Sequence, residues 1–253
     1  MSESSPPAEF EQLTEISTEK PTLIEGLPGH GMVASIAVDQ ITKQLEMDHH
    51  GNVSSQEFPP AVTFEDGLVQ DLVRVYSSDD PAVMTLKSDI ALPPSSFEAL
   101  SRCVLEDLAD EFDRAIFLAG APAESEGQIG DVIGVGTTEA MRDALVDAGI
   151  EVATDRGVVG GVTGALVKEC FHAGIPAALL VVRSHPFLPD PKAARAVIEN
   201  ALEPLVDFDI ETTELAEQAD EIQQQMEQIA QQYQQMVEDQ TPDQQSAARG
   251  MFQ

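Results

Sequence analysis

A glycine-rich segment near the start of the chain is the first place where residue types and spacing suit ligand chemistry. Gly26, Gly29, His30 and Gly31 give the pattern G-x-x-G-H-G, between a short apolar strand and a helix over 32–45. A helix N-terminus binds anions through its free N–H groups. The spacing differs from the dinucleotide fingerprint and from the Walker loop, and no Lys-Ser or Lys-Thr follows. We therefore treat these residues as a candidate ligand loop, with close packing between strand and helix as the alternative.

The five histidines do not form a recognisable metal or catalytic pattern. His49 and His50 are expected in a polar loop facing solvent, and His172 at a helix C-terminus, where the dipole favours an imidazolium. His30 and His185 both follow predicted strands, at the sheet edge where α/β proteins build their sites. No H-x-x-x-H or H-x-x-E spacing supports metal ligation. We predict neither a metal site nor a cofactor.

Nucleophilic side chains also lack supporting partners. Cys103 and Cys170 are too few for a disulfide scaffold, a zinc finger or an iron–sulfur cluster. Ser35 and Ser184 are not in a G-x-S-x-G elbow. With 45 Asp and Glu in the chain, neighbouring carboxylates are expected by chance. The sequence therefore predicts no catalytic residues.

Short strands and amphipathic helices alternate along the chain and must position any site at the loop. A strand over 21–25 precedes the loop, and the stretch 53–86 has a strand-like composition with Asp66-Gly67 as a hairpin turn. Thr137 or Thr138 is placed to cap a helix that ends near Ala148. The pattern also predicts helices over 97–112, 161–172 and 191–206, and strands over 69–76, 82–86, 115–119, 131–135 and 175–182.

This order of elements favours an α/β fold. Strands that alternate with helices build a largely parallel sheet, and the β-rich stretch indicates that the sheet is mixed. We predict one α/β domain over 21–210, with a mixed, largely parallel sheet flanked by helices. Residues 1–20 are polar and contain two prolines, so we expect them to be partly disordered.

The C-terminal part of the chain has a different pattern. Apolar or small residues repeat with alternating spacings of 4 and 3: Leu215, Ala219, Ile222, Met226, Ile229, Tyr233 and Met236. Such a heptad seam predicts an amphipathic, coiled-coil-like helix over 211–238, packed either in an oligomer or on its own domain. Residues 239–253 then form a polar tether that ends in the apolar and aromatic pair Met251-Phe252, followed by Gln253. Binding to another protein would explain that ending.

The charge excludes some classes of partner. The formal net charge is −32, with the acidic residues spread along the chain, and such a field repels nucleic acid and anionic lipid surfaces. High ionic strength screens the self-repulsion, which points to a salt-loving cytoplasm. No apolar run is long enough for a membrane span, and no signal sequence opens the chain. We expect a cytoplasmic, halophilic protein that binds neither nucleic acid nor membrane.

Several segments resemble those of a known family. The segment 24–33, Ile-Glu-Gly-Leu-Pro-Gly-His-Gly-Met-Val, resembles the opening motif of the archaeal form of the proteasome assembly chaperone 2 (PAC2) superfamily. Segments 161–166, 174–180 and 189–194 resemble its later blocks, so the resemblance covers about 20–225. Ala34 stands where the family pattern has Gly. The resemblance implies an α/β fold similar to purine nucleoside phosphorylases, self-association, and a proteasome-linked chaperone role without established catalysis.

The last three residues fit that resemblance. Met251-Phe252-Gln253 resembles the hydrophobic–tyrosine–any motif that proteasome-binding factors insert between 20S α-subunits, with Phe252 in place of Tyr. The alternative is a terminus that ends in apolar residues by chance. The resemblance implies a non-catalytic homo-oligomer that docks its tails into the 20S α-ring, as assembly chaperone or ATP-independent binding factor. The rival class is a small-ligand-binding or nucleoside-processing enzyme that uses the candidate ligand loop.

Overall fold

The computed structural model describes residues 8–17 and 20–239. The chain divides into two compact units, residues 1–212 and residues 213–253. The described part of the second unit is a single helix, α7 (Thr213–Asp239). A helix was predicted over 211–238, whereas the heptad packing of α7 and its use as a coiled coil stay predictions. Among the described residues, no helix is both long enough and apolar enough to cross a bilayer.

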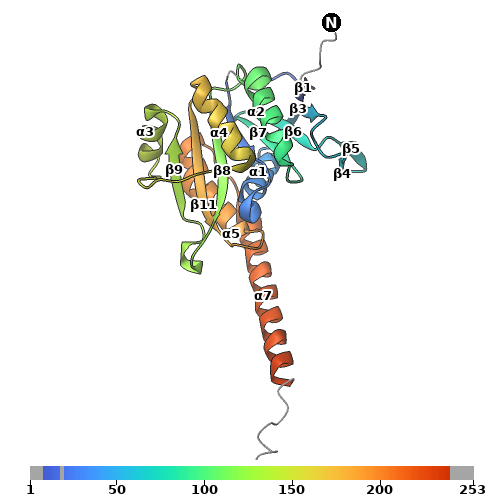
Figure 1. Ribbon diagram of the computed structural model, residues 1–253, viewed down its shortest axis with the longest axis vertical. Helices are drawn as coiled ribbons and strands as arrows, with labels where there is room; N and C mark the ends of the chain where they lie inside the picture. The colour runs from blue at the N-terminus through green and yellow to red at the C-terminus, as the bar shows by residue number, and fades with distance from the viewer. Residues whose placement is uncertain (1–7, 18–19, 240–253) are drawn as a thin grey trace, which may run out of the picture. The chain divides into compact units, whose positions relative to one another are not determined.

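The first unit is built on one large sheet (Figure 1). In the described part of the chain it has nine strands in the order β1-β3-β6-β7-β2-β8-β11-β9-β10. Their bounds are β1 Ala8–Gln12, β2 Thr22–Gly26, β3 Asp48–Ser55, β6 Val73–Asp79, β7 Ala82–Ser88, β8 Arg114–Pro122, β9 Val132–Gly136, β10 Glu151–Val152 and β11 Ala177–Ser184.

The predicted mixed sheet is confirmed, but parallel pairing is less general than expected. Strands β7, β2, β8 and β11 are parallel neighbours in the centre. Strands β1, β3, β6 and β7 pair antiparallel, and β9 is antiparallel to β11 but parallel to β10. For β6 and β7 the reason lies in the connection, because β6 ends at Asp79 and β7 begins at Ala82. Such a short link allows antiparallel pairing only, whereas a parallel pair needs a longer crossover.

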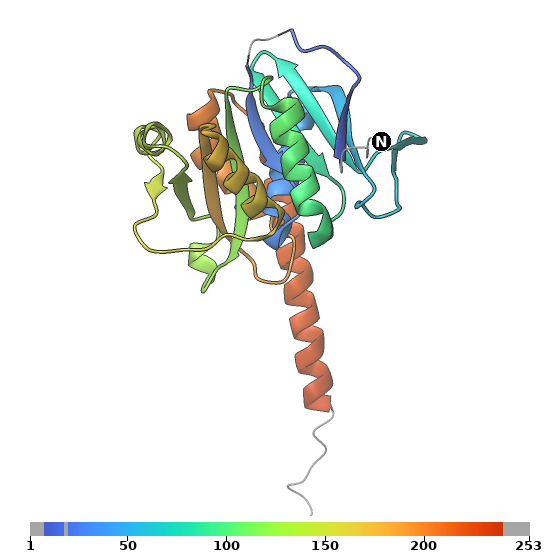
Figure 2. The same cartoon turned by 45° about the horizontal axis from the view of Figure 1, so that its top comes forward.

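Helices cover both faces of this sheet. Figures 1 and 2 show α2 (Phe97–Cys103) and α4 (Gly161–Ala173) on one face, and α1 (Val33–Gln44) and α5 (Pro191–Val197) on the other. A π-helical stretch, Val104–Leu108, continues α2, and α5 continues through Ile198–Leu202 into α6 (Glu203–Val206). The helix α3 (Glu139–Asp147) follows β9. Helices on both faces explain why the central strands are mainly apolar.

Local signals define where several helices begin and end. The Thr138 side chain accepts a hydrogen bond from the Met141 backbone N–H at 3.1 Å, so Thr138 is the N-cap of α3. Asp190 caps α5 in the same way by accepting from Ala193 N–H at 2.9 Å. Gly174 ends α4 with a φ of 73°, a left-handed conformation that glycine adopts without a steric penalty. The sequence predicted this first cap at Thr137 or Thr138, and in the structure it is Thr138.

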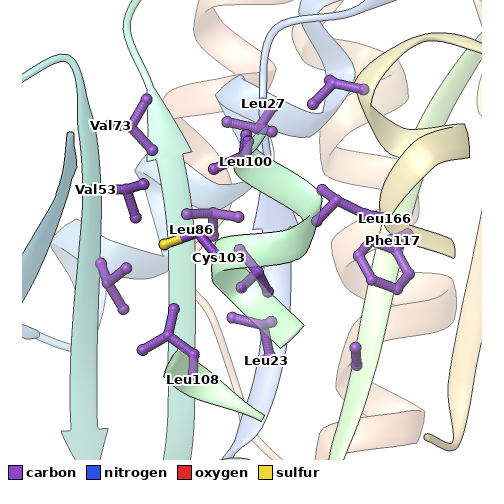
Figure 3. Close-up of a cluster of buried hydrophobic side chains, with 14 of the residues drawn as sticks. Leu23, Leu27, Val53, Val73, Leu86, Leu100, Cys103, Leu108, Phe117 and Leu166 are labelled. Carbon is purple, nitrogen blue, oxygen red and sulfur yellow. The ribbon is translucent and has the colours of Figure 1, made fainter. Parts of the chain in front are cut away.

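The main hydrophobic core lies between the sheet and the α2–α4 layer (Figure 3). Leu23 from β2, Leu86 from β7 and Phe117 from β8 are fully buried there. Leu100 of α2 and Leu166 of α4 pack onto them from above the sheet. Burial of each such side chain stabilises the fold by about 1.5–3 kcal/mol. This core packs the central parallel strands against α2 and α4.

A separate two-stranded hairpin lies between β3 and β6. Its strands are β4 (Thr63–Glu65) and β5 (Leu68–Gln70), and they pair antiparallel. Asp66 and Gly67 have φ values of 50° and 79°, as the central residues of a type I′ turn require. The hairpin predicted from Asp66-Gly67 is therefore confirmed.

Two expectations about polar segments differ from the structure. Residues 8–12 were expected to belong to a partly disordered segment, but they form β1, which pairs with β3 at the sheet edge. The prediction that His49 and His50 lie in a solvent-facing loop is wrong, since both are on β3. His50 is fully buried, and both of its ring nitrogens have a partner. Its Nδ1 lies 2.6 Å from the Thr14 carbonyl oxygen, and its Nε2 lies 2.8 Å from Glu111 Oε2. These partners replace the water that a histidine loses on burial.

Candidate functional site

The candidate ligand loop leaves β2 at the carboxyl edge of the central parallel strands. Strands β2, β8 and β11 run in the same direction, so their carboxyl ends meet at one edge of the sheet. A 3-10 turn, His30–Met32, then leads into α1. Open α/β sheets bind ligands beyond the carboxyl ends of their strands. The loop therefore lies where a site of this fold class is expected.

The loop glycines have different roles. A Cβ at Gly26 would collide with the Val38 side chain, so Gly26 allows β2 and α1 to pack closely. Gly31 has a φ of 64°, and a Cβ there would lie 2.5 Å from Ser184 Oγ. A Cβ at Gly29 would meet no heavy atom within 4 Å. The packing alternative thus explains Gly26 and Gly31, whereas Gly29 faces open space.

Gly29 and His30 line a cavity of about 380 Å³. The other walls come from β8, from the start of α4, and from residues 91, 92 and 97. The lining residues are Pro28, Gly29, His30, Ala34, Ala91, Leu92, Phe97, Leu118, Ala119, Gly120, Ala121, Val158, Val159, Gly160, Gly161, Val162, Thr163 and Val181. Because these walls are mostly apolar and carry neither Lys nor Arg, the cavity suits a neutral ligand better than a phosphate.

The fully buried carboxyl of Glu25 lies at the end of β2, next to residues that line this cavity. Its Oε1 accepts from the Leu27 N–H at 3.1 Å, and its Oε2 accepts from the Leu118 N–H at 3.4 Å. Thr163 Oγ1 lies 3.4 Å from both oxygens. Burial raises the pKa of Glu25 to about 8, although these hydrogen bonds lower it. The carboxyl is therefore mainly protonated at neutral pH.

Our reading of the sequence missed Glu25 as a site residue. The available signal was an acidic side chain within an otherwise apolar strand, Thr-Leu-Ile-Glu-Gly at 22–26. Alternation along β2 puts Glu25 on the same side as Leu23, which is the side covered by α2 and α4. The carboxyl consequently ties together β2, β8 and α4.

Two other polar atoms near the loop are buried without a partner among the described residues. They are His30 Nε2 and Ser184 Oγ. Ser184 lies beneath Gly31, and the Gly120 backbone lies so close to the His30 carbonyl that a Cβ at position 120 would collide with it. Leaving a buried polar group unpaired costs about 1–3 kcal/mol. His30 Nε2 is therefore the atom of the cavity lining with the most to gain from a ligand hydrogen bond.

Segments distant in the sequence meet at this loop. Thr163 belongs to the segment 161–166 and contacts Glu25, while the Asp190 N–H donates to the Gly31 carbonyl at 2.9 Å. The Asp190 carboxylate also accepts from the His185 N–H at 2.6 Å. Three of the segments that carry the family resemblance thus converge on one sheet edge.

The remaining candidates lie elsewhere. His172 is exposed near the end of α4, and His185 does not line the loop cavity. Cys103 and Cys170 are buried, and burial raises the pKa of the Cys170 thiol to about 12. Among the described residues, no group of three or more His, Cys, Asp or Glu has the arrangement of a metal site. Met251, Phe252 and Gln253 lie outside the described residues.

Sequence comparison identifies relatives over most of the chain. The model of the PAC2 family matches residues 23–230. An uncharacterized protein of Methanocaldococcus jannaschii is 28% identical over 214 residues, which cover 84% of this chain and 87% of that protein.

Solved structures agree with this match. PbaA of Pyrococcus furiosus, described as an archaeal homolog of proteasome-assembly chaperone, superposes with a TM-score of 0.81 at 26% identity. The alignment covers 92% of this chain and 96% of PbaA. PbaB of the same organism, described as an archaeal proteasome activator, has the same fold, with a TM-score of 0.78 at 21% identity over 89% of this chain and 99% of PbaB. From the family match and the converging segments, we conclude that this chain belongs to the PAC2 family.

Proposed function

We propose that this protein is a non-catalytic, homo-oligomeric scaffold that associates with the 20S proteasome. The similarity to PbaA carries the proposal, because it extends over 92% of this chain and that protein is described as a homolog of a proteasome-assembly chaperone. The fold shared with PbaB, described as a proteasome activator, is consistent with it. Both an assembly chaperone and an ATP-independent binding factor fit this scaffold.

The C-terminal residues are the proposed contact with the proteasome. Met251, Phe252 and Gln253 end a polar tether, and together they offer an apolar side chain, an aromatic ring and a terminal carboxylate. Such a group fills a pocket between two 20S α-subunits and pairs with a lysine there. Phe252 lacks the hydroxyl of the usual tyrosine, which removes a hydrogen bond worth about 1 kcal/mol. Several tails on one oligomer compensate for weak single contacts through effective concentration.

A pull-down tests the tail. Purified 20S proteasome is immobilised in molar salt and offered the full-length protein or a variant that ends at Gly250. We expect the full-length protein to be retained and the truncated protein to be lost, with an unchanged circular dichroism spectrum and oligomer mass. Gln253→Ala is the matched control, since any residue is accepted at that position. Equal retention of the truncated variant would contradict the tail's role.

One further comparison separates the two forms of the role. An ATP-independent binding factor changes the peptidase activity of mature 20S particles, whereas an assembly chaperone changes the rate at which α-subunits form rings. Both rates are measured with the full-length protein and with the variant ending at Gly250. A protein that binds but alters neither rate would contradict both forms.

The loop cavity favours a second candidate function, the binding of a small neutral molecule. The observation behind it is a cavity of about 380 Å³ beside the protonated Glu25, with His30 Nε2 unpaired among the described residues. Gly29→Leu places an apolar side chain where the backbone is extended and an added Cβ meets no heavy atom within 4 Å. Ligand-observed NMR with a fragment library compares the wild type with this variant. Signals lost in Gly29→Leu would support the candidate.

The enzyme alternative is tested with inosine and inorganic phosphate as probes. Release of hypoxanthine by the wild type, abolished in Gly29→Leu, would establish a nucleoside-processing enzyme in place of the non-catalytic scaffold. We expect no release above the level of a buffer control, because phosphate needs nearby cations and none lines the cavity.

A further inference from the structure

The β4–β5 hairpin exposes apolar side chains that its own domain does not cover. Phe64 is 79% exposed and lies directly opposite Val69, so both side chains point to the same face of the hairpin. Val62 precedes Phe64 by two residues and is also exposed. We call Val62, Phe64 and Val69 the apolar hairpin face. Exposed apolar clusters on an otherwise charged surface mark interaction sites.

A groove of about 750 Å³ lies at β9 and β11, bounded by α4 and the segment 153–159. We call it the β9–α4 groove. Its walls are largely apolar, with Ile133, Val135, Val159, Val167, Leu179 and Val181. Two more of its lining residues reach far into solvent, since Phe171 is 60% exposed and Val158 is 97% exposed. The groove therefore offers apolar surface of the size that an aromatic side chain fills.

The charge of the β9–α4 groove differs from that of the whole protein. Arg156, Lys168 and Arg183 line it, together with only Glu151 and Asp155 among the acids. In the full chain 45 acids face 13 bases. A surface on which cations outnumber carboxylates attracts an acidic partner.

The hairpin carries the complementary charge. Asp66 is exposed in the turn at its tip, and Asp71 is exposed just after β5. Glu65 pairs with Leu68, so its side chain points to the face opposite Phe64. A carboxylate at the tip of an apolar hairpin matches a groove that combines apolar walls with three cations. The apolar hairpin face and the β9–α4 groove thus complement each other in both polarity and charge.

These two surfaces lie at opposite ends of the same sheet. The hairpin connects β3 and β6, near one edge, whereas β9 and β10 form the other edge (Figure 1). A hairpin therefore reaches a β9–α4 groove only on another copy of the chain. Contacts between two different surfaces of one protein are head-to-tail, and they close into rings when the rotation allows it.

We propose that the apolar hairpin face of one copy docks in the β9–α4 groove of the next, with Phe64 inside and Asp66, at the tip of the hairpin, facing Arg156. The proposal rests on the homo-oligomer of the proposed function and supplies its interface. Burial of Phe64, Phe171 and Val158 removes exposed apolar surface from both copies. At molar salt, where ion pairs are strongly screened, the apolar contact supplies most of the affinity.

Molar mass in solution tests the apolar contact. Phe64→Asp and Phe171→Asp are compared with the wild type by light scattering and sedimentation velocity in molar salt. Phe187→Asp is the matched control, because Phe187 is 88% exposed and lies outside both surfaces. We expect each interface variant to weaken self-association about tenfold or more, and the control to keep the wild-type mass. A monomeric wild type, or folded Phe64→Asp with the wild-type mass, would overturn the proposal.

A charge exchange and a cross-link keep the test independent of folding defects. Asp66→Lys and Arg156→Glu each place like charges together, so each alone is expected to weaken association at reduced salt, where screening is weaker, and the two combined are expected to restore it. A mixture of Val69→Cys chains and Val158→Cys chains keeps Phe64 in place and should form a disulfide-linked pair on oxidation, since the native cysteines are buried. Failure of the double variant to recover, together with no cross-link, would overturn the interface.

The experiments test the proposed interface and the proteasome-binding tail independently of each other. The interface alone would be refuted by two results together. The 20S proteasome would retain the full-length protein but not the variant ending at Gly250, and Phe64→Asp would have the wild-type molar mass. Loss of mass in Phe64→Asp, combined with no proteasome binding by any variant, would refute the proteasome role alone.

Discussion

Thr163 Oγ1 lies 3.4 Å from both carboxyl oxygens of Glu25, although 138 residues separate the two along the chain. The contact joins the end of a central strand to the first turn of α4 inside the domain. It also connects two segments that resemble blocks of the PAC2 family. The loop edge of the sheet is therefore held together by a buried polar contact as well as by hydrophobic packing.

The first prediction concerns pH. The folded pKa of Glu25 is raised from 4.5 to about 8, so the folded protein holds a proton that the unfolded chain releases between these values. The bound proton stabilises the folded protein fully below about pH 4.5, and this stabilisation is lost as the pH rises to about 8. The free energy of unfolding therefore falls over this range, by a few kcal/mol at most.

Glu25→Gln should remove that slope, because the amide does not titrate in this range. Denaturant unfolding from pH 5 to 8 in molar salt measures it, as the difference between variant and wild type. Glu124→Gln, at an exposed position, is the control and should follow the wild type. A constant difference between Glu25→Gln and wild type across this range would show that Glu25 does not titrate there.

The second prediction separates two loop glycines. Gly31→Ala should destabilise the fold by about 1–3 kcal/mol, because φ is 64° and the new Cβ would lie 2.5 Å from Ser184 Oγ. Gly29→Ala should stay within about 0.5 kcal/mol of wild type, since its Cβ would meet nothing within 4 Å. Thermal unfolding of both variants provides the comparison, and equal effects would contradict the assigned roles.

The third prediction concerns β1. His50→Ala removes the contacts with the Thr14 carbonyl and with Glu111, and it leaves space beside Phe10, whose ring centroid lies 5.3 Å from that of His50. We expect hydrogen exchange in β1 to be faster in His50→Ala than in the wild type, whereas exchange in the central strands should not change. His172→Ala, at an exposed position, should leave the exchange pattern unchanged. Unaltered protection of β1 in His50→Ala would show that His50 does not anchor the strand.

The fourth prediction tests the core. Leu100→Ala in α2 should lower the free energy of unfolding by about 2–5 kcal/mol, because the side chain is fully buried between helix and sheet. Val146→Ala, on the exposed side of α3, should cost less than about 1 kcal/mol. Chemical denaturation measures both, and similar losses would place α2 outside the stabilising core.

The fifth prediction concerns salt. The formal net charge of the chain is −32, so its acidic segments repel one another. This repulsion is strong at about 0.1 M salt, where the Debye length is about 10 Å, and weak at about 1 M salt, where it is about 3 Å. We expect the melting temperature to fall on transfer from about 1 M to about 0.1 M salt. Differential scanning fluorimetry across a salt series measures this. A melting temperature independent of salt would contradict the expected role of charge repulsion.

The local elements of this protein follow from the order of its residues. The Asp66-Gly67 turn, the Thr138 cap and the left-handed Gly174 follow from interactions within a few residues, which are visible in the order of residue types. The alternation of apolar strands and amphipathic helices likewise indicated an α/β fold with a mixed sheet.

How those elements pair, and which side chains they bury, depends on contacts between segments that are distant in the chain. Glu25 gave a local signal, an acidic residue in an apolar strand, but its partner Thr163 and the His50 partner Glu111 come from segments far away in the chain. No local pattern showed which groups would satisfy either side chain. The different roles of Gly29 and Gly31 depend on what lies beside each, which spacing does not reveal. The apolar hairpin face and the β9–α4 groove became recognisable as complementary surfaces once the strand order had placed them at opposite ends of one sheet, because burial and charge at a surface are properties of the folded chain.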